Sequence, residues 1–184
     1  AASILPISEN NTVLDMCAAP GGKALHAAEL AFEGQVEARD LTTQKVELIK
    51  ENIRRIGATN VIARQWDATV FDESSKNKYD VVIADLPCSG LGIIRKKPDI
   101  KYNQTAESLQ ELVELQAYIL DTVSSYVKKG GTLCFSTCTI NKDENENQVN
   151  NFLSTHSEFT IDMMKQLFPD SEHDGFFICV MKKS

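Results

Sequence analysis

The sequence lacks the features of a secreted or membrane-spanning protein. No apolar run approaches the roughly 20 residues that a transmembrane helix requires. Residues 1–11, AASILPISENN, contain neither a basic region nor a long apolar stretch, which argues against a signal peptide. We therefore expect a cytoplasmic protein without a membrane partner.

Cysteines at metal-binding spacing are also missing. The five cysteines are an odd number, and no two of them form a C-x-x-C motif. This pattern disfavours both a disulfide framework and a zinc site, so we expect no metal. Thiols that stay reduced in the cytosol are free to pack in a core or to react.

Positive charge is scarce, because 19 basic residues stand against 26 acidic ones and the net charge is −7. That is the wrong sign for a domain that holds nucleic acid by its overall field. The sequence has one dense basic run, formed by Arg95, Lys96, Lys97 and Lys101. We interpret this run as a contact for RNA phosphates. A solvated surface loop is the competing interpretation.

Short β-branched runs alternate with helical periods along the chain. The expected strands are 12–17, 34–40, 60–66, 79–85 and 131–137, followed by two closing strands after residue 158. The expected helices are 22–32, 43–57, 105–129 and 143–156. The acidic run DENEN (143–147) is predicted to be the first turn of the last helix, where carboxylates are favoured. This order predicts a single α/β domain with a mostly parallel, seven-stranded, Rossmann-like sheet and helices on both faces.

The loop after the first expected strand is predicted to bind S-adenosylmethionine. Ligands of open α/β sheets bind at the carboxyl ends of the strands. The loop consists of Cys17, Ala18, Ala19, Pro20, Gly21, Gly22 and Lys23. Its small residues let the backbone approach a ligand closely. A dinucleotide is the alternative ligand, but the loop does not match the G-x-G-x-x-G spacing that cradles a pyrophosphate.

Two carboxylates are predicted to complete this cofactor site. Asp40 ends the second expected strand, where a carboxylate can accept hydrogen bonds from ribose hydroxyls. Asp67 follows the third, where it can accept from an adenine amino group. We expect Trp66 to pack beside the adenine.

Two further loops carry cysteines at the same edge of the expected sheet. Cys88 lies in the loop DLPCSGLG, which begins at Asp85, and Cys138 lies in STCT. The two strands before these loops are neighbours in the usual sheet order, so both cysteines should face one pocket. Cys134 and Cys179 lie inside strands and are expected to be core residues.

This arrangement suits methylation of cytosine at carbon 5, which is a poor nucleophile. A thiolate that adds to carbon 6 pushes electron density onto carbon 5. Asp85 is the natural carboxyl group to stabilise charge at ring nitrogen 3. A base must then remove the proton from carbon 5, and the second thiolate could assist. Spacing alone does not decide which cysteine attacks.

The motifs LDMCAAPGGK, DLPCSGLG and STCT, in this order, resemble the RNA 5-methylcytosine methyltransferases of the Sun type. These are RsmB-like enzymes that act on small-subunit ribosomal RNA, and the resemblance covers essentially the whole chain. It implies that Cys138 is the nucleophile and that Cys88 assists release. It also implies that the loop from Cys17 to Lys23 lies along S-adenosylmethionine, with Asp40, Asp67 and Asp85 around it.

Members of that family carry RNA-binding segments before the methyltransferase domain. We therefore expect residues 1–184 to be the catalytic domain of a longer protein. Alternative functions are cytosine-5 methylation of transfer RNA, methylation of an amino group without thiol chemistry, and a cofactor-binding domain that is inactive when isolated. The oligomeric state is not predicted.

Overall fold

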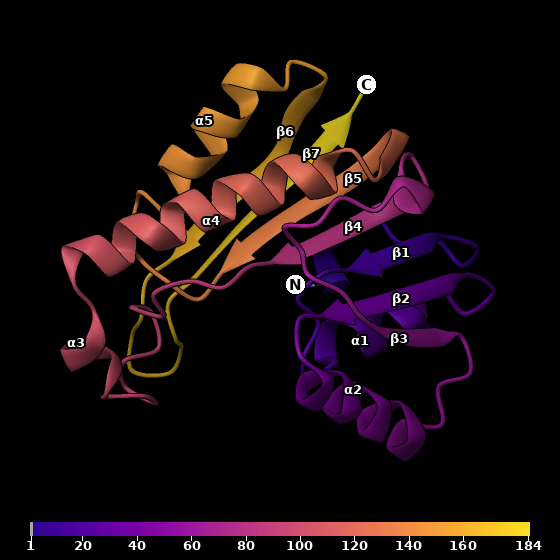
Figure 1. Cartoon of the computed structure of the whole chain (residues 1–184), viewed down its shortest axis with the longest axis horizontal. Coiled ribbons are helices and arrows are strands. Elements are labelled where there is room, and N and C mark those ends of the chain that lie inside the picture. The colour runs from indigo at the N-terminus through magenta and orange to yellow at the C-terminus, as the bar shows by residue number, and fades with distance from the viewer. Residues whose placement is uncertain (1) are drawn as a thin grey trace.

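Within residues 2–184, which the computed structural model describes, seven strands form one sheet in the order β3-β2-β1-β4-β5-β7-β6 (Figure 1). The strands are β1 (Thr12–Asp15), β2 (Gln35–Asp40), β3 (Val61–Gln65), β4 (Tyr79–Asp85), β5 (Val127–Thr137), β6 (Phe159–Leu167) and β7 (Phe176–Lys183). The helices are α1 (Gly22–Leu30), α2 (Thr43–Ile56), α3 (Ile100–Asn103), α4 (Ala106–Ser124) and α5 (Glu146–Thr155), with short 3-10 turns at Ala2–Ile4 and Glu73–Ser75. Strands β1 to β5 are parallel, and β7 is antiparallel to both of its neighbours. The predicted α/β fold is confirmed.

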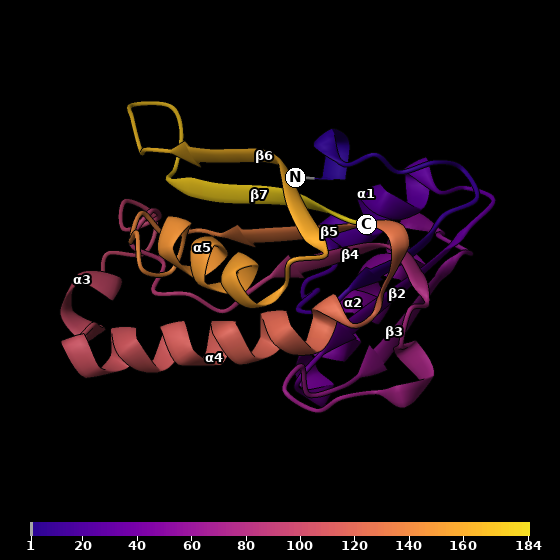
Figure 2. The same cartoon turned by 90° about the horizontal axis from the view of Figure 1, so that it is seen from above.

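Helices cover both faces of the sheet, and each face has its own apolar core. Leu14 and Val82 pack with α4 and α5 on one face, whereas Val13 and Val81 pack with α1 and α2 on the other. Figure 2 shows α4 and α5 together on one side of the strands. Successive residues of the central strands are buried on opposite faces, as expected for a parallel sheet covered on both sides.

The boundary between α4 and β5 differs from the sequence prediction. The helix expected over 105–129 ends at Ser124, and β5 begins at Val127. Val127 pairs with Tyr79 of β4, so tertiary pairing overrides the helical period that continues through this segment. The strand then has an irregular register before Thr132, and Gly130 adopts a positive φ of 78° there. The last helix also begins later than expected, at Glu146.

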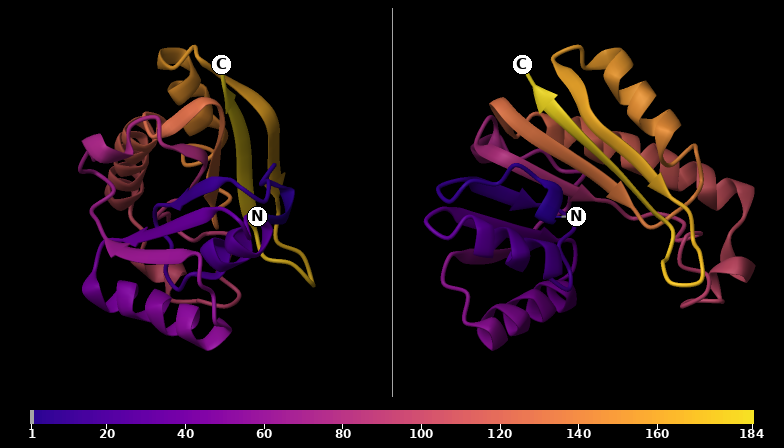
Figure 3. Two further views of the ribbon diagram at one scale, coloured as in Figure 1. Left: turned by 90° about the vertical axis from the view of Figure 1, so that its right-hand side faces the viewer. Right: turned by 180° about the vertical axis from the view of Figure 1, so that it is seen from behind.

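The C-terminal hairpin reaches the end of the sheet where the parallel strands finish. Its loop, residues 168–175, lies at the same end of the molecule as α3 (Figure 3). The N–H of Gly175 donates to the carbonyl of Gly92, with 2.8 Å between N and O. This contact ties the hairpin to the segment that follows β4.

Among these residues, no helix is long and apolar enough to cross a bilayer. The same part of the chain has no group of three or more His, Cys, Asp or Glu side chains that could hold a metal ion.

Candidate active site

The carboxyl ends of the parallel strands bring the predicted loops to one edge. Strand β1 ends at Asp15, β2 at Asp40 and β4 at Asp85. Asp85 is in register with Ser136 of β5, so the loops after β4 and β5 are neighbours. The sheet order predicted from the sequence therefore holds where the two cysteine loops meet.

The loop from Cys17 to Lys23 is fixed by contacts to the next βα unit. The backbone N–H of Ala19 donates to Asp40 Oδ2 at 2.9 Å, and Asn52 of α2 donates to the carbonyl of Pro20, also at 2.9 Å. Gly21 has a φ of 107°, in the left-handed region that L side chains rarely adopt. The loop is thus preformed, and glycine at position 21 is required by its backbone.

A cavity of about 100 Å³ lies beside this loop, between Cys17, Asp40, Trp66 and Asp67. Asp40 is buried, and its Oδ1 accepts from the Leu41 N–H and the Lys45 ammonium, which leaves room for one more donor at Oδ2. Only Oδ1 of Asp67 is engaged, by the N–H and hydroxyl of Thr69, and these hydrogen bonds lower the Asp67 pKa. The expected ribose and adenine acceptors therefore line one cavity.

Trp66 packs against the core beside this cavity, as expected. Its indole N–H donates to the carbonyl of Val70 at 2.8 Å, and the guanidinium of Arg39 lies 5.2 Å from its ring centroid. These contacts hold the ring as part of the cavity wall.

Asp85 accepts from two elements at once. The Lys23 ammonium lies 2.5 Å from its Oδ2, and the Ser136 hydroxyl donates to its Oδ1 at 2.6 Å. Burial opposes the charge on Lys23, but the ion pair with Asp85 outweighs burial and raises the Lys23 pKa. Asp85 thereby connects the first loop to the strand that leads to Cys138.

Asp15 ends β1, just before this loop, with its side chain almost fully buried, and neither carboxylate oxygen has a hydrogen-bond partner among residues 2–184. Burial raises its pKa to about 7, although the charge of Lys23 and the backbone N–H of Ala24, which approaches the carboxylate without meeting hydrogen-bond geometry, oppose the shift. A buried carboxylate without partners is costly unless a ligand supplies a donor or a cation. Its position at the end of an apolar strand gives no sign in the sequence of this unpartnered state.

The two loop cysteines meet. Their Sγ atoms lie 3.3 Å apart, within hydrogen-bond distance, and both residues are partly accessible to solvent. The hydrogen bond from the Cys88 thiol lowers the pKa of Cys138 to about 7 despite the opposing effect of burial. The same hydrogen bond, together with burial, raises the pKa of Cys88. Cys138 is therefore the sulfur that ionises more easily.

Cys134 and Cys179 are fully buried in β5 and β7, which confirms the prediction that they are core residues. Burial raises the pKa of both thiols to about 12. They are unsuited to nucleophilic chemistry near neutral pH.

The basic run after β4 is divided by its contacts. Arg95 donates to the carbonyls of Asp170 and Ser171, and Lys96 forms an ion pair with Asp174 at 2.5 Å. Lys97 and Lys101 make no ion pair within residues 2–184. Arg95 and Lys96 thus bind the hairpin loop, whereas Lys97 and Lys101 are available to a ligand.

A family model described as "16S rRNA methyltransferase RsmB/F" matches residues 2–182. The chain belongs to this RsmB/F family. It is 40% identical to the "probable ribosomal RNA small subunit methyltransferase B" of Bacillus subtilis, over 99% of its own length and 45% of that relative. The chain therefore spans less than half of the length of this curated relative.

Solved structures carry the same fold as this RsmB/F domain. The structure of NSun6 from Pyrococcus horikoshii, solved with SFG, aligns with 99% of this chain over 50% of the NSun6 chain. The TM-score is 0.88 and the sequence identity is 28%. The structure of a SAM-dependent methyltransferase from Aquifex aeolicus aligns with 97% of this chain over 85% of its own chain. The TM-score is 0.67 and the sequence identity is 14%. The domain has the Rossmann-like fold of SAM-dependent methyltransferases.

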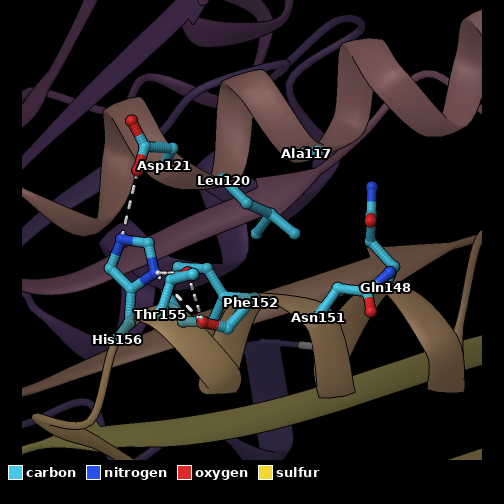
Figure 4. A pocket seen from close by; sticks show the side chains of 8 residues that line it. All are labelled: Ala117, Leu120, Asp121, Gln148, Asn151, Phe152, Thr155 and His156. Carbon is cyan, nitrogen blue, oxygen red and sulfur yellow. Dashed lines mark hydrogen bonds and ion pairs between the residues drawn. The ribbon is translucent and has the colours of Figure 1, made fainter.

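A second cavity, of about 230 Å³, lies between α4 and α5 in the RsmB/F domain (Figure 4). His156 stacks on Phe152 at its floor and lies 3.2 Å from Asp121 across the gap. The cavity runs along α5 from Gln148 to His156, whereas the cysteine loops contact Glu144 and Asn145, just before the helix begins. None of its lining residues belongs to the predicted site.

One further residue lies close to the cysteine loops of the RsmB/F domain. Glu144, expected in the first turn of the last helix, precedes that helix and is fully buried between the two cysteine loops. Its acidic neighbours Asp143 and Glu146 are more exposed than Glu144. The composition of the acidic run therefore does not indicate which of its carboxylates is buried.

Proposed function

We propose that this domain transfers a methyl group from S-adenosylmethionine to carbon 5 of a cytosine in small-subunit ribosomal RNA, through a covalent adduct on Cys138. The observation that carries the proposal is the 3.3 Å contact between Cys88 and Cys138 at the edge where Lys23 and Asp85 also meet. Membership of the RsmB/F family supports ribosomal RNA as the substrate.

The residues around the first loop fit S-adenosylmethionine, which supplies an electrophilic methyl group when bound. The loop from Cys17 to Lys23 would lie along it, with Asp40 toward the ribose and Asp67 toward the adenine. The unpartnered oxygens of Asp15 are an observation in favour, because an ammonium group near them would satisfy a buried carboxylate. A small-residue loop without a phosphate-cradling motif fits a ligand that has no phosphate.

Cys138 begins the reaction as a thiolate. Its sulfur adds to carbon 6 of the cytosine, and the electron pair of the 5,6 double bond moves toward carbon 5 and ring nitrogen 3. The Lys23–Asp85 pair lies at the same edge, and a proton shared by these two groups would stabilise the charge on nitrogen 3. Carbon 5 then accepts the methyl group.

Release requires loss of the proton on carbon 5 and of the sulfur on carbon 6. We assign proton removal to the Cys88 sulfur, which lies next to Cys138. The electrons of the broken C–H bond restore the 5,6 double bond, and the Cys138 thiolate departs. Cys88 acts as a base only after its own thiol has released its proton to solvent, once Cys138 is bonded to carbon 6. The proton taken from carbon 5 then restores the Cys88 thiol, so that both sulfurs return to their starting protonation states.

RNA phosphates would be held by Lys97 and Lys101, which face no competing carboxylate within hydrogen-bonding range in the described chain. Arg95 and Lys96 would support them by holding the hairpin loop in place. A net charge of −7 leaves the rest of the RNA contact to other parts of a longer protein.

Trapping tests this proposal. Full-length protein incubated with S-adenosylmethionine and small-subunit ribosomal RNA containing 5-fluorocytosine should form a denaturant-stable complex, because fluorine at carbon 5 prevents release. Cys138→Ser should abolish the complex, and Cys88→Ser should retain it. The reverse result would exchange the two roles, and full methylation by the double variant would instead support an amino-group methyltransferase. Bisulfite sequencing of cellular RNA with and without the gene would identify the cytosine.

A further inference from the structure

Glu144 is a fully buried carboxylate in the turn before α5, although its sequence context is an acidic surface run. Its Oε2 accepts from the backbone N–H of Ser89 at 2.8 Å and from the side-chain amide of Gln116 at 3.1 Å. Its Oε1 accepts from the Ser89 hydroxyl at 2.5 Å. Thr139 and Asn141 add longer hydrogen bonds to Oε1, of 3.3 and 3.2 Å. A carboxylate without solvent contact needs such donors to remain charged.

The partners of Glu144 are the residues that follow the two cysteines. Ser89 comes directly after Cys88, and Thr139 comes directly after Cys138. The hydroxyls of Ser89 and Thr139 also bond each other, with 2.7 Å between the oxygens. One carboxylate therefore connects two loops that are 50 residues apart in sequence. The structure gives Glu144 no hydrogen bond to either sulfur, so any effect on the thiols acts through these loops.

Asn145 holds the Cys138 loop from its other side. The Thr137 hydroxyl donates to Asn145 Oδ1 at 2.6 Å, and Asn145 Nδ2 donates to the carbonyl of Thr139 at 3.1 Å. The residues before and after Cys138 are thus both anchored to the start of α5. The backbone on both sides of Cys138 is therefore fixed relative to α5.

We infer that Glu144 is a positioning residue, which holds the loops of Cys88 and Cys138 so that the two sulfurs stay in contact. This inference rests on the proposed function, because it concerns the geometry of the same thiol pair. The 3.3 Å separation is what allows Cys88 to donate to Cys138 and favour its thiolate. Displacements of about 1 Å in reacting groups can lower rates by about a hundredfold. A carboxylate that joins the two loops therefore controls both the ionisation of Cys138 and the position of its partner.

The test compares Glu144→Gln with Thr139→Val and with Gln148→Met as a control. Glu144→Gln keeps the size of the side chain but turns one acceptor into a donor, opposite the donors of Ser89 and Gln116. Thr139→Val removes the hydroxyl that contacts Ser89 and Glu144, with little change of shape. It tests the same connection between the two loops if the Glu144→Gln variant does not fold. Gln148 is equally buried on α5, but it bonds the Val113 carbonyl of α4 and not the cysteine loops.

Three quantities are measured on the full-length protein: the rate of adduct formation with 5-fluorocytosine RNA, the pH midpoint of Cys138 alkylation by iodoacetamide, and the dissociation constant of S-adenosylmethionine. We expect Glu144→Gln to lower the adduct rate about tenfold to a hundredfold and to move the alkylation midpoint above about 7, with cofactor affinity unchanged. Thr139→Val should give smaller changes in the same direction. Gln148→Met should lower only thermal stability.

Two results would overturn the inference. One is a wild-type adduct rate and alkylation midpoint in both Glu144→Gln and Thr139→Val. The other is a loss of rate that follows thermal stability in all three variants without a change of midpoint, which is what a merely structural role predicts. Failure of the proposed function is distinct, because Cys138→Ser would then still form the adduct or methylate the RNA.

Discussion

The backbone N–H of Gly92 donates a hydrogen bond to the carbonyl oxygen of Cys138, with 3.0 Å between N and O. The contact links the segment after Cys88 to the loop that holds the proposed nucleophile. A Cβ atom at position 92 would lie 2.8 Å from that oxygen and 2.5 Å from the carbonyl of Gly175. Backbone from three segments converges at a position that only glycine fits.

Gly92→Ala should therefore separate these segments and slow adduct formation with 5-fluorocytosine RNA by about tenfold or more. Gly131→Ala is the matched control, because a Cβ there would lie 2.9 Å from the carbonyls of Asp80 and Lys128, far along β5 from the cysteine loop. We expect Gly131→Ala to lower thermal stability while leaving the adduct rate near that of the wild type. Equal rates for the two variants would argue against a role of the Gly92 contact.

The ionisation of Cys138 should depend on the group at position 88. The thiolate is the reactive form, so alkylation of Cys138 should rise with pH through about 7 and fall below it. Cys88→Ala removes the hydrogen-bond donor and should move the midpoint upward, toward the value of about 8.5 of an ordinary thiol. Cys88→Ser keeps a hydroxyl donor and should give a smaller shift. Identical midpoints in all three proteins would contradict this source of the low pKa.

Mild oxidation should join Cys88 to Cys138. Their sulfurs are 3.3 Å apart, and a disulfide requires about 2.05 Å, so a small movement suffices. Treatment with diamide should remove two free thiols, abolish adduct formation and be reversed by dithiothreitol. Peptide mass spectrometry should find Cys134 and Cys179 unmodified, because both are fully buried. A Cys138 that pairs with either of them instead would contradict the arrangement of the loops.

Asp15 should make stability depend on pH in the absence of cofactor. Its pKa is raised to about 7 in the folded protein, against about 3.9 in an unfolded chain. Between these values the folded protein binds the extra proton, so the free energy of unfolding should fall as pH rises from about 4 to about 7. Asp15→Asn lacks this titration, and its stability relative to the wild type should increase over that window by on the order of 1–4 kcal/mol. Denaturant unfolding at pH 5 and pH 8 measures the difference; a constant difference would contradict it.

RNA affinity should depend on Lys97 and Lys101 more directly than on Lys96. Charge reversal at Lys97 or Lys101 should weaken RNA binding. Each change should also reduce the slope of log K against log salt concentration by about the value of one phosphate contact. Lys96→Gln removes an ion pair with Asp174 and should act mainly on the hairpin loop. Filter binding at several salt concentrations separates these effects. Equal loss of salt dependence in all three variants would contradict the division of the basic run.

The parts of the site predicted from sequence are those whose residue types are unusual for their place in the fold. Cysteines in loops after β4 and β5 contrast with those inside strands, and burial confirms the assignment of Cys134 and Cys179 to the core. The fold followed from the alternation of strands and helices.

The features that sequence did not predict depend on tertiary contacts. Asp15 is one residue of an apolar strand, and its lack of partners is visible only once the loop above it is in place. Glu144 has the same residue type as its half-buried neighbour Glu146, and only the approach of Ser89 and Thr139 distinguishes them. The end of α4 was misjudged because pairing of Val127 with Tyr79 competes with local helical periodicity.

The position of β7 between β5 and β6 affects the order in which the molecule can be assembled during synthesis. Strand β6 emerges from the ribosome first but has no partner in the sheet until β7 has been made. The strand that leads to Cys138 likewise keeps an open edge until residues near 183 are available. The loops of Cys88 and Cys138 thus acquire their full support only after this hairpin has been synthesised and has closed against Gly92.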